Sequence, residues 1–365
     1  MKRYIEKMDD KLTLEDLGYC DCFESSGGTD GLPIARVTAQ YKDAYRVRSS
    51  NGEYLAKITG KHMFEALSPE DYPAVGDWVT ITNLGEQQAV IHRVLPRKTI
   101  IKRKASGKNE IQIIAANIDV AFVIESVDRD FSLNRCERYF AIARDGGIQP
   151  AVILNKADLI TNEEAVSKAD QIRNRFGKND FIMTSTVTNE GLDELKAYIT
   201  KGKTYCFLGS SGVGKSSLIN KLIGVDQIKT NAISIKADRG THTTTNREMY
   251  FLESGGIVID NPGMREVGMT DTGEGIDSCF DPIVSLAREC KYADCTHIHE
   301  PGCAVLSAVK SGQLDEDQYA NYLDLKKEAE YFEMTELERR QKDNQFGKFI
   351  KKAKKQLRRY GHKDY

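Results

Sequence analysis

The residues Gly209 to Ser216, GSSGVGKS, form a glycine-rich segment of the kind that binds phosphate. An apolar stretch precedes this segment and a helical pattern follows it, and in that context backbone amides and a helix N-terminus face phosphate oxygens. We expect Lys215 to reach the β- and γ-phosphates of a nucleoside triphosphate and Ser216 to coordinate Mg²⁺. The residues predicted to contact the phosphates are Gly209, Ser210, Ser211, Gly212, Val213, Gly214, Lys215, Ser216 and Ser217.

A second group of phosphate-side residues follows later in the chain. The apolar stretch GGIVIDNPGM contains Asp260, which we expect to hold Mg²⁺ through water, and Gly263, whose amide would contact the γ-phosphate. The polar loop DRGTHTTTNRE lies between the two motifs and has the position of a first switch region. Either Thr243 or Thr244 would supply the second hydroxyl ligand of Mg²⁺, and the sequence does not distinguish them.

The segment AVILNKADLI brings Asn155, Lys156 and Asp158 to the end of an apolar run. The carboxylate of Asp158 can accept hydrogen bonds from both N1–H and the 2-amino group of guanine, a pair of donors that adenine lacks. Asn155 can approach the N7/O6 edge, and the stem of Lys156 can pack over the ring plane. Ser185 and Thr186 follow another apolar stretch, in the position of a loop that lies behind the ring. These residues predict GTP and GDP as ligands.

The order of these motifs is unusual, because the guanine motifs precede the phosphate loop and the switches. A compact domain whose termini lie close together can be opened elsewhere and rejoined without moving its strands. The order therefore predicts a circularly permuted GTPase domain.

The residue that activates the attacking water is less obvious. GTPases of the Ras type place a glutamine after the switch glycine. This chain has Met264 there, which cannot orient water. His242 is the candidate catalytic residue, together with Lys215, and the alternative is a histidine on a surface loop. We expect slow hydrolysis that accelerates when a partner orders the loop.

Cys290, Cys295, His297 and Cys303 fall within fourteen residues of a segment rich in turn signals. Three thiolates and one imidazole match a closed tetrahedral zinc site of structural type. His299 is a competing ligand, and free buried cysteines are the alternative. We therefore predict one structural Zn²⁺.

The elements that must position these residues suggest several domains, because 365 residues exceed one ordinary domain. Short alternating runs separated by turn signals predict a barrel of OB type, and near-continuous apolar strands alternating with helices predict a parallel α/β domain. The expected parts are an N-terminal extension (1–32), an RNA-binding OB barrel (33–105), the GTPase domain (106–272), a helical zinc-binding domain (273–335) and a basic tail (336–365).

Charge and hydropathy indicate a nucleic-acid partner and a cytoplasmic location. The net charge is only −2, but the C-terminal tail is strongly basic, which is typical of nucleic-acid contact, and the alternative is a solvated helix face. Basic and aromatic residues also alternate in the barrel strands, at Tyr41, Tyr45, Arg46 and Arg48. We expect no membrane segment, because no apolar run approaches about 20 residues, and no signal peptide.

The permuted NKAD and GSSGVGKS, the GTHTTT loop, DNPGMRE and CKYADCTHIHEPGCAV together resemble the bacterial ribosome small-subunit-dependent GTPase A family (RsgA, also called YjeQ). The resemblance implies a GTPase that binds the small ribosomal subunit and its rRNA and acts in late maturation. It also implies a catalytic histidine at His242 and the spacing of the zinc ligands. We expect a monomer. The alternatives are an RNA-binding assembly chaperone that uses GTP only as an affinity switch, and a translation factor acting on complete ribosomes.

Overall fold

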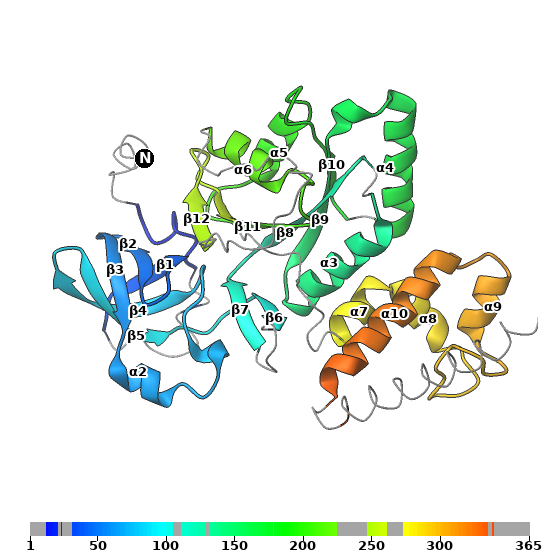
Figure 1. The fold of residues 1–365 in the computed structure, drawn as a ribbon, viewed down its shortest axis with the longest axis horizontal. Helices are drawn as coiled ribbons and strands as arrows, with labels where there is room; N and C mark the ends of the chain where they lie inside the picture. The colour runs from blue at the N-terminus through cyan, green and yellow to red at the C-terminus, as the bar shows by residue number, and fades with distance from the viewer. Residues whose placement is uncertain are drawn as a thin grey trace, which may run out of the picture.

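The computed structural model describes residues 12–20, 23, 31–104, 111–128, 131–177, 179–224, 247–260, 273–334 and 338. These residues form a β-barrel, a central α/β domain and a C-terminal group of helices, with the central domain between the other two (Figure 1). This arrangement confirms the predicted fold class. None of the helices in the described part of the chain has the length and apolar character that crossing a bilayer requires.

The barrel consists of β1 (Ile34–Gln40), β2 (Tyr45–Ser49), β3 (Gly52–Ile58), β4 (Trp78–Gly85) and β5 (Gln88–Val94). The strands pair in the order β1-β2-β3-β5-β4, and the additional pairing of β1 with β4 closes the barrel. Between β3 and β4 lie a short helix, α2 (Gly60–Glu65), and a 3-10 turn, η2 (Pro69–Asp71). Alternating side chains such as Val37, Val47 and Ile91 fill the interior, so the period-2 pattern of the sequence produces the barrel core.

A hairpin of β6 (Ile100–Lys104) and β7 (Ile111–Ala116) connects the barrel to the central domain. Its two strands lie on either side of the boundary expected between residues 105 and 106. Trp78 is fully buried and belongs to the core.

The central domain contains, in chain order, β8 (Val120–Ser126), α3 (Leu133–Asp145), β9 (Gln149–Asn155), η3 (Ala157–Leu159), α4 (Asn162–Phe176), β10 (Phe181–Met183), α5 (Leu192–Tyr198), β11 (Thr204–Leu208), α6 (Lys215–Ile223), β12 (Arg247–Phe251) and β13 (Ile257–Asp260). Its strands lie in the order β10-β9-β8-β11-β13-β12, and all neighbours are parallel except β12. Every residue of β8 and β11 is buried, which explains why these strands show continuous apolar character in the sequence.

The sheet continues beyond β12 into the barrel. The end of β1 pairs with the start of β12 through Ala39 opposite Glu248 and Gln40 opposite Arg247. A register shift after Val37 bends this end of β1. Such bulges re-aim a strand, and here the bend carries β1 from the barrel to the edge of the central sheet.

The barrel and the central domain also meet at the buried Arg36 of β1. Its guanidinium donates to the backbone carbonyls of Leu17 (2.6 Å), Asn117 (3.0 Å) and Gly76 (3.2 Å) and lies over the ring of Trp78. Burial lowers the pKa of Arg36 to about 10, and nearby Asp119 and Asp77 oppose the shift. The group therefore stays charged at neutral pH.

The C-terminal helices are α7 (Gly273–Cys279), α8 (Asp281–Ala287), α9 (Ala304–Lys310) and α10 (Glu316–Glu333). Helix α7 packs directly against α3 of the central domain, with α10 beside it (Figure 1). The approach is close at Gly275, where an added Cβ would lie 2.3 Å from the carbonyl oxygen of Ala141. Only glycine fits there without a shift of the backbone.

The same interface holds a buried carboxylate, Glu137 of α3. Arg175 of α4 donates to it from Nε (2.6 Å) and Nη2 (3.3 Å), and Gln318 and Asn321 of α10 donate to it at 3.2 and 2.5 Å. Burial raises the pKa of Glu137, although Arg175 and the two amides oppose that shift. Glu137 of α3 thus binds side chains from two other helices, α4 and α10.

Candidate nucleotide site and metal centre

The residues predicted to bind nucleotide lie at the carboxyl ends of parallel strands. Strand β9 ends at Asn155, β11 leads into Gly209, and β13 ends at Asp260. Because β8 lies between β9 and β11, the guanine and phosphate motifs flank one strand at the same edge of the sheet. Ligands of open α/β sheets bind at this edge, where connections leave in opposite directions.

The phosphate loop has the backbone that its glycines predict. Gly209, Gly212 and Gly214 have φ values of 148°, 84° and 100°, which L-residues rarely adopt. A Cβ on Gly214 would lie 2.2 Å from Nδ2 of Asn155. The loop therefore needs glycine at Gly214 both for its conformation and for the approach of the guanine motif.

Lys215 begins helix α6, and its side chain folds back over the loop. Its Nζ donates to the carbonyl oxygens of Gly209 (2.8 Å) and Ser210 (2.5 Å). The ammonium group therefore lies against the backbone of the phosphate loop. Ser216 and Ser217 follow in the first turn of α6, where helix N–H groups are free to bind phosphate.

Asn155 ties the guanine motif to the phosphate loop. Its Nδ2 donates to the carbonyl oxygen of Val213 (2.8 Å), and its Oδ1 accepts from the hydroxyl of Thr184 (3.1 Å). The side chain is fully buried, so each bond is protected from water. The structure thus gives Asn155 a role in holding two loops together, which the four-residue motif alone does not predict.

The rest of the guanine motif is also held by side chains. Lys156 has a left-handed backbone (φ 66°), and its Nζ donates to Asp128 (2.8 Å), which in turn accepts from Ser126 (2.7 Å). The hydroxyl of Ser185 donates to Asp158. The loop that carries Ser185 and Thr186 therefore lies against the carboxylate that we expect to recognise guanine.

Asp260 is a half-buried carboxylate at the phosphate side of the site. Burial raises its pKa to about 6; Lys215 opposes this shift and Glu248 adds to it. A cation would stabilise the ionised form. This environment fits the expected place of Mg²⁺ beside Asp260.

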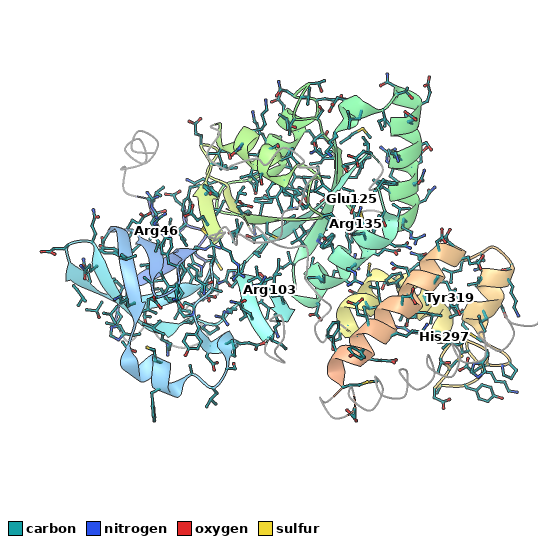
Figure 2. All side chains as sticks on the ribbon, in the orientation of Figure 1. Arg46, Arg103, Glu125, Arg135, His297 and Tyr319 are labelled. Atoms are coloured by element: carbon teal, nitrogen blue, oxygen red, sulfur yellow. The ribbon has the colours of Figure 1, made fainter. Side chains whose placement is uncertain are left out.

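Several residues near the site were not predicted from the sequence. Glu125 of β8 is fully buried and accepts from Nε and Nη2 of Arg135 at 2.8 Å each (Figure 2). One turn further along α3, burial raises the pKa of Tyr139, and Ser210 of the phosphate loop opposes this shift. The sequence signal for these residues is the pair of polar residues, Glu125 and Ser126, that ends the apolar run VAFVIES (120–126), because ligands bind at this edge of a parallel sheet.

Four predicted site residues, His242, Thr243, Thr244 and Gly263, lie outside the described residues. Their roles stay predictions from the sequence. Ser211 and Gly212 are exposed at the tip of the phosphate loop, whereas Val213 is buried.

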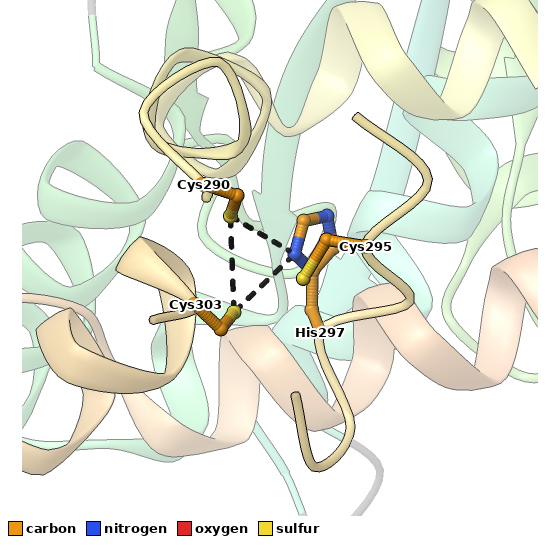
Figure 3. Close-up of side chains that lie close together, drawn as sticks. All are labelled: Cys290, Cys295, His297 and Cys303. Atoms are coloured by element: carbon orange, nitrogen blue, oxygen red, sulfur yellow. Dashed lines mark hydrogen bonds between the residues drawn. The ribbon is translucent and has the colours of Figure 1, made fainter. Parts of the chain in front are cut away.

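The four predicted metal ligands form one cluster (Figure 3). The Nδ1 atom of His297 lies 3.6 Å from Sγ of Cys290 and 3.5 Å from Sγ of Cys303, and the two sulfur atoms are 3.8 Å apart. Tetrahedral zinc with ordinary Zn–S and Zn–N bond lengths requires ligand separations of about 3.8 Å (S···S) and about 3.6 Å (S···N). The residues therefore fit zinc.

The loop around these ligands is fixed by its own hydrogen bonds. His297 has a positive φ of 60°, and its carbonyl oxygen accepts from the hydroxyl of Tyr319 on α10 at 2.7 Å (Figure 2). Glu300 accepts from the backbone N–H groups of Thr296, Ile298 and His299. Burial lowers the pKa of His297 and favours the neutral imidazole that metal binding needs. His299 is not part of the cluster.

Comparison with known proteins decides the family. A family model described as RsgA GTPase matches residues 94–270. The small ribosomal subunit biogenesis GTPase RsgA 2 of Lactiplantibacillus plantarum is 40% identical over 92% of this chain and 94% of its own length. The chain belongs to the RsgA GTPase family. It is therefore a GTP-hydrolysing enzyme, and membership of the family implies a guanine nucleotide and Mg²⁺ as ligands.

Other members of the RsgA family and two solved structures agree. RsgA 1 of Bacteroides thetaiotaomicron is 38% identical over 88% of this chain and 90% of its own length. The crystal structure of YjeQ from Thermotoga maritima matches 80% of this chain and 96% of its own, with a TM-score of 0.61 and 26% identity. YloQ, whose title describes a circularly permuted GTPase, matches 83% of this chain and 97% of its own at a TM-score of 0.60 and 22% identity, and so supports the fold. The predicted permutation is confirmed.

Proposed function

We propose that this GTPase binds the small ribosomal subunit and its rRNA, and that it couples GTP hydrolysis to late maturation of the subunit and to its own release. The observation that carries this proposal is the extent of the similarity. A relative named for small ribosomal subunit biogenesis aligns with 92% of the chain, so the similarity includes the barrel and the C-terminal helices as well as the GTPase domain.

Within the nucleotide site, the proposal assigns guanine to Asp158 and Asn155 and the phosphates to the loop 209–217 and Lys215. Mg²⁺ would be held by Ser216, Asp260 and one of Thr243 and Thr244. The hydrogen bonds of Ser185 to Asp158 and of Asn155 to the phosphate loop support this assignment, because they hold the two halves of the site in one rigid unit. Bound Mg²⁺ would neutralise charge that develops on the phosphates.

The cluster of three cysteines and one histidine would hold a structural zinc ion, which fixes the loop between α8 and α9. The polypeptide reaches this module soon after Gly263 of the second switch. Ordering of that switch by GTP would therefore move or fix the module on the ribosomal subunit. Cross-linking of the module to rRNA, compared between GDP and a non-hydrolysable GTP analogue, tests this step, and an identical pattern with both nucleotides would contradict it.

The central experiment measures GTP hydrolysis with and without purified small subunits, with ATP as the control nucleotide. We expect severalfold stimulation by small subunits and no hydrolysis of ATP. Lys215→Ala should lose nucleotide binding, whereas His242→Ala should bind GTP without hydrolysing it and should stay on the subunit. If His242→Ala loses hydrolysis but is released normally, GTP acts only as an affinity switch and the protein is an assembly chaperone.

A further inference from the structure

Four residues from the barrel and the GTPase domain lie in one row across the continuous sheet. Strand register places Arg46 opposite Ala39, Ala39 opposite Glu248, and Glu248 opposite Asp260. Side chains of directly opposed residues project from the same face, with Cβ atoms about 5 Å apart. The row therefore brings a second carboxylate, Glu248, beside the carboxylate of Asp260.

Glu248 is held on several sides. Strand β1 pairs with β12 at this residue and β13 pairs on the opposite side, so its backbone has neighbours in both directions. The hydroxyl of Tyr250, two residues along the same face of β12, donates to Oε2 of Glu248 at 3.3 Å. A side chain fixed in this way is suited to orient a neighbouring group.

The barrel end of the row carries a positive charge of its own. The guanidinium of Arg46 lies 5.5 Å from the ring centre of Tyr41 and pairs with Glu53 at 3.4 Å (Figure 2 labels Arg46). Arg46 is therefore occupied within the barrel by Tyr41 and Glu53, and among the described residues it forms no ion pair with Glu248. The carboxylate of Glu248 can therefore interact with groups bound beside Asp260.

We propose that Glu248 is a positioning residue for Mg²⁺-dependent GTP binding and hydrolysis. Its carboxylate would accept hydrogen bonds from water molecules of the Mg²⁺ shell and so help Asp260 to orient them. Mg²⁺ keeps several waters when it binds phosphates and one or two carboxylates, and each of these waters needs an acceptor. The inference rests on the proposed placing of Mg²⁺ at Asp260.

The hairpin β12–β13 offers a matched control, Glu253. It is exposed in the turn after β12, five residues and about 17 Å along an extended strand from Glu248. Charges separated by more than about 8 Å at physiological ionic strength are largely screened. Removing the charge of Glu253 should therefore not alter the Mg²⁺ site.

The test measures the affinity of the full-length protein for a fluorescent, non-hydrolysable GTP analogue over a series of Mg²⁺ concentrations. We expect Glu248→Gln to raise the Mg²⁺ concentration for half-maximal tight binding about tenfold, since one unit charge acts on a divalent ion at short range. Glu248→Asp keeps the charge but shortens the side chain, and should give a shift of about threefold. Glu253→Gln should give none. Thermal unfolding of each variant shows whether the fold is retained.

Three outcomes separate the inference from the proposed function. An unchanged Mg²⁺ dependence in a folded Glu248→Gln variant, or an equal shift in Glu253→Gln, overturns the inference. If Glu248→Gln does not fold, the folded Glu248→Asp variant replaces it, and an unchanged Mg²⁺ dependence in that variant overturns the inference. Asp260→Asn is the reference: if it also leaves the Mg²⁺ dependence unchanged, the proposed Mg²⁺ site itself is wrong.

Discussion

A buried charge lies at the contact of the GTPase domain with each of its two neighbours, and the two charges are satisfied differently. At the barrel, the guanidinium of Arg36 is bonded to three backbone carbonyls from separate segments. At the C-terminal helices, the carboxylate of Glu137 is bonded to the side chains of Arg175, Gln318 and Asn321. Backbone partners cannot be exchanged by substitution, so this hydrogen-bond network at the barrel depends on Arg36 alone, beside the pairing of β1 with β12. At the C-terminal helices, by contrast, the buried charge is bonded to several side chains, each of which can be substituted.

This comparison predicts the largest single effect at Arg36. Arg36→Met should lower the free energy of unfolding by about 4 kcal/mol, because the buried carbonyls of Leu17 and Asn117 lose their donor, whereas the carbonyl of Gly76 still accepts from Nδ2 of Asn117. Denaturant unfolding measures the loss. Arg46→Met, which removes a part-exposed arginine from the neighbouring strand, is the control and should cost less than about 1 kcal/mol. Equal losses of unfolding free energy in the two variants would show that Arg36 does not stabilise the contact between the barrel and the GTPase domain.

Glu137→Ala should cost somewhat less, about 3 kcal/mol, because Arg175 loses a buried partner. Arg175 keeps a second partner, Asp315, at 2.6 Å, which limits the loss. We expect limited proteolysis to release the C-terminal helices from this variant. Glu328→Ala removes a more exposed carboxylate that pairs with Arg138 across the same interface. This control should lose about 1 kcal/mol or less, and similar proteolysis of both variants would contradict the role of Glu137.

Disturbing the close packing between α3 and α7 should produce the smallest of the three losses of unfolding free energy. Gly275→Ala would force a Cβ against the backbone of Ala141, and we expect a loss of about 2 kcal/mol. Gly273→Ala, two residues earlier in the same helix, meets nothing within 4 Å and should change stability by less than about 0.5 kcal/mol. Thermal unfolding of the pair checks this difference. If both variants are equally stable, α7 can shift away from α3 at little cost in free energy, and close packing at Gly275 does not stabilise the interface.

Local patterns predicted the parts of this molecule well. The alternating runs predicted the five barrel strands, and the continuous apolar runs predicted the parallel sheet. The spacing of Cys290, Cys295, His297 and Cys303 predicted the metal cluster. These features depend on neighbours in sequence, where period and spacing carry the information.

The contacts between the domains could not be predicted in the same way. Arg36 looks like a solvent-facing residue of a barrel strand, and Glu137 looks like the polar face of an amphipathic helix. Each is buried only because a segment from elsewhere in the chain covers it. The pairing of β1 with β12 has the same origin, since nothing in either strand specifies the other. Long-range contacts decided each of these positions, and a single sequence does not reveal them.

The pairing of β1 with β12 also has a consequence in time. The side chains of Gln40 and Arg247 meet although 207 positions separate them. At a synthesis rate of about 5–20 residues per second, β1 waits about 10 to 40 s for its partner strand to be made. The barrel has its own buried core, so it can fold during this interval with one strand end unpaired. The strands that carry the guanine motifs are synthesised after the barrel, and the residues on the phosphate side of the nucleotide site are synthesised after those strands. A growing chain therefore cannot hold nucleotide until nearly three quarters of it has been made.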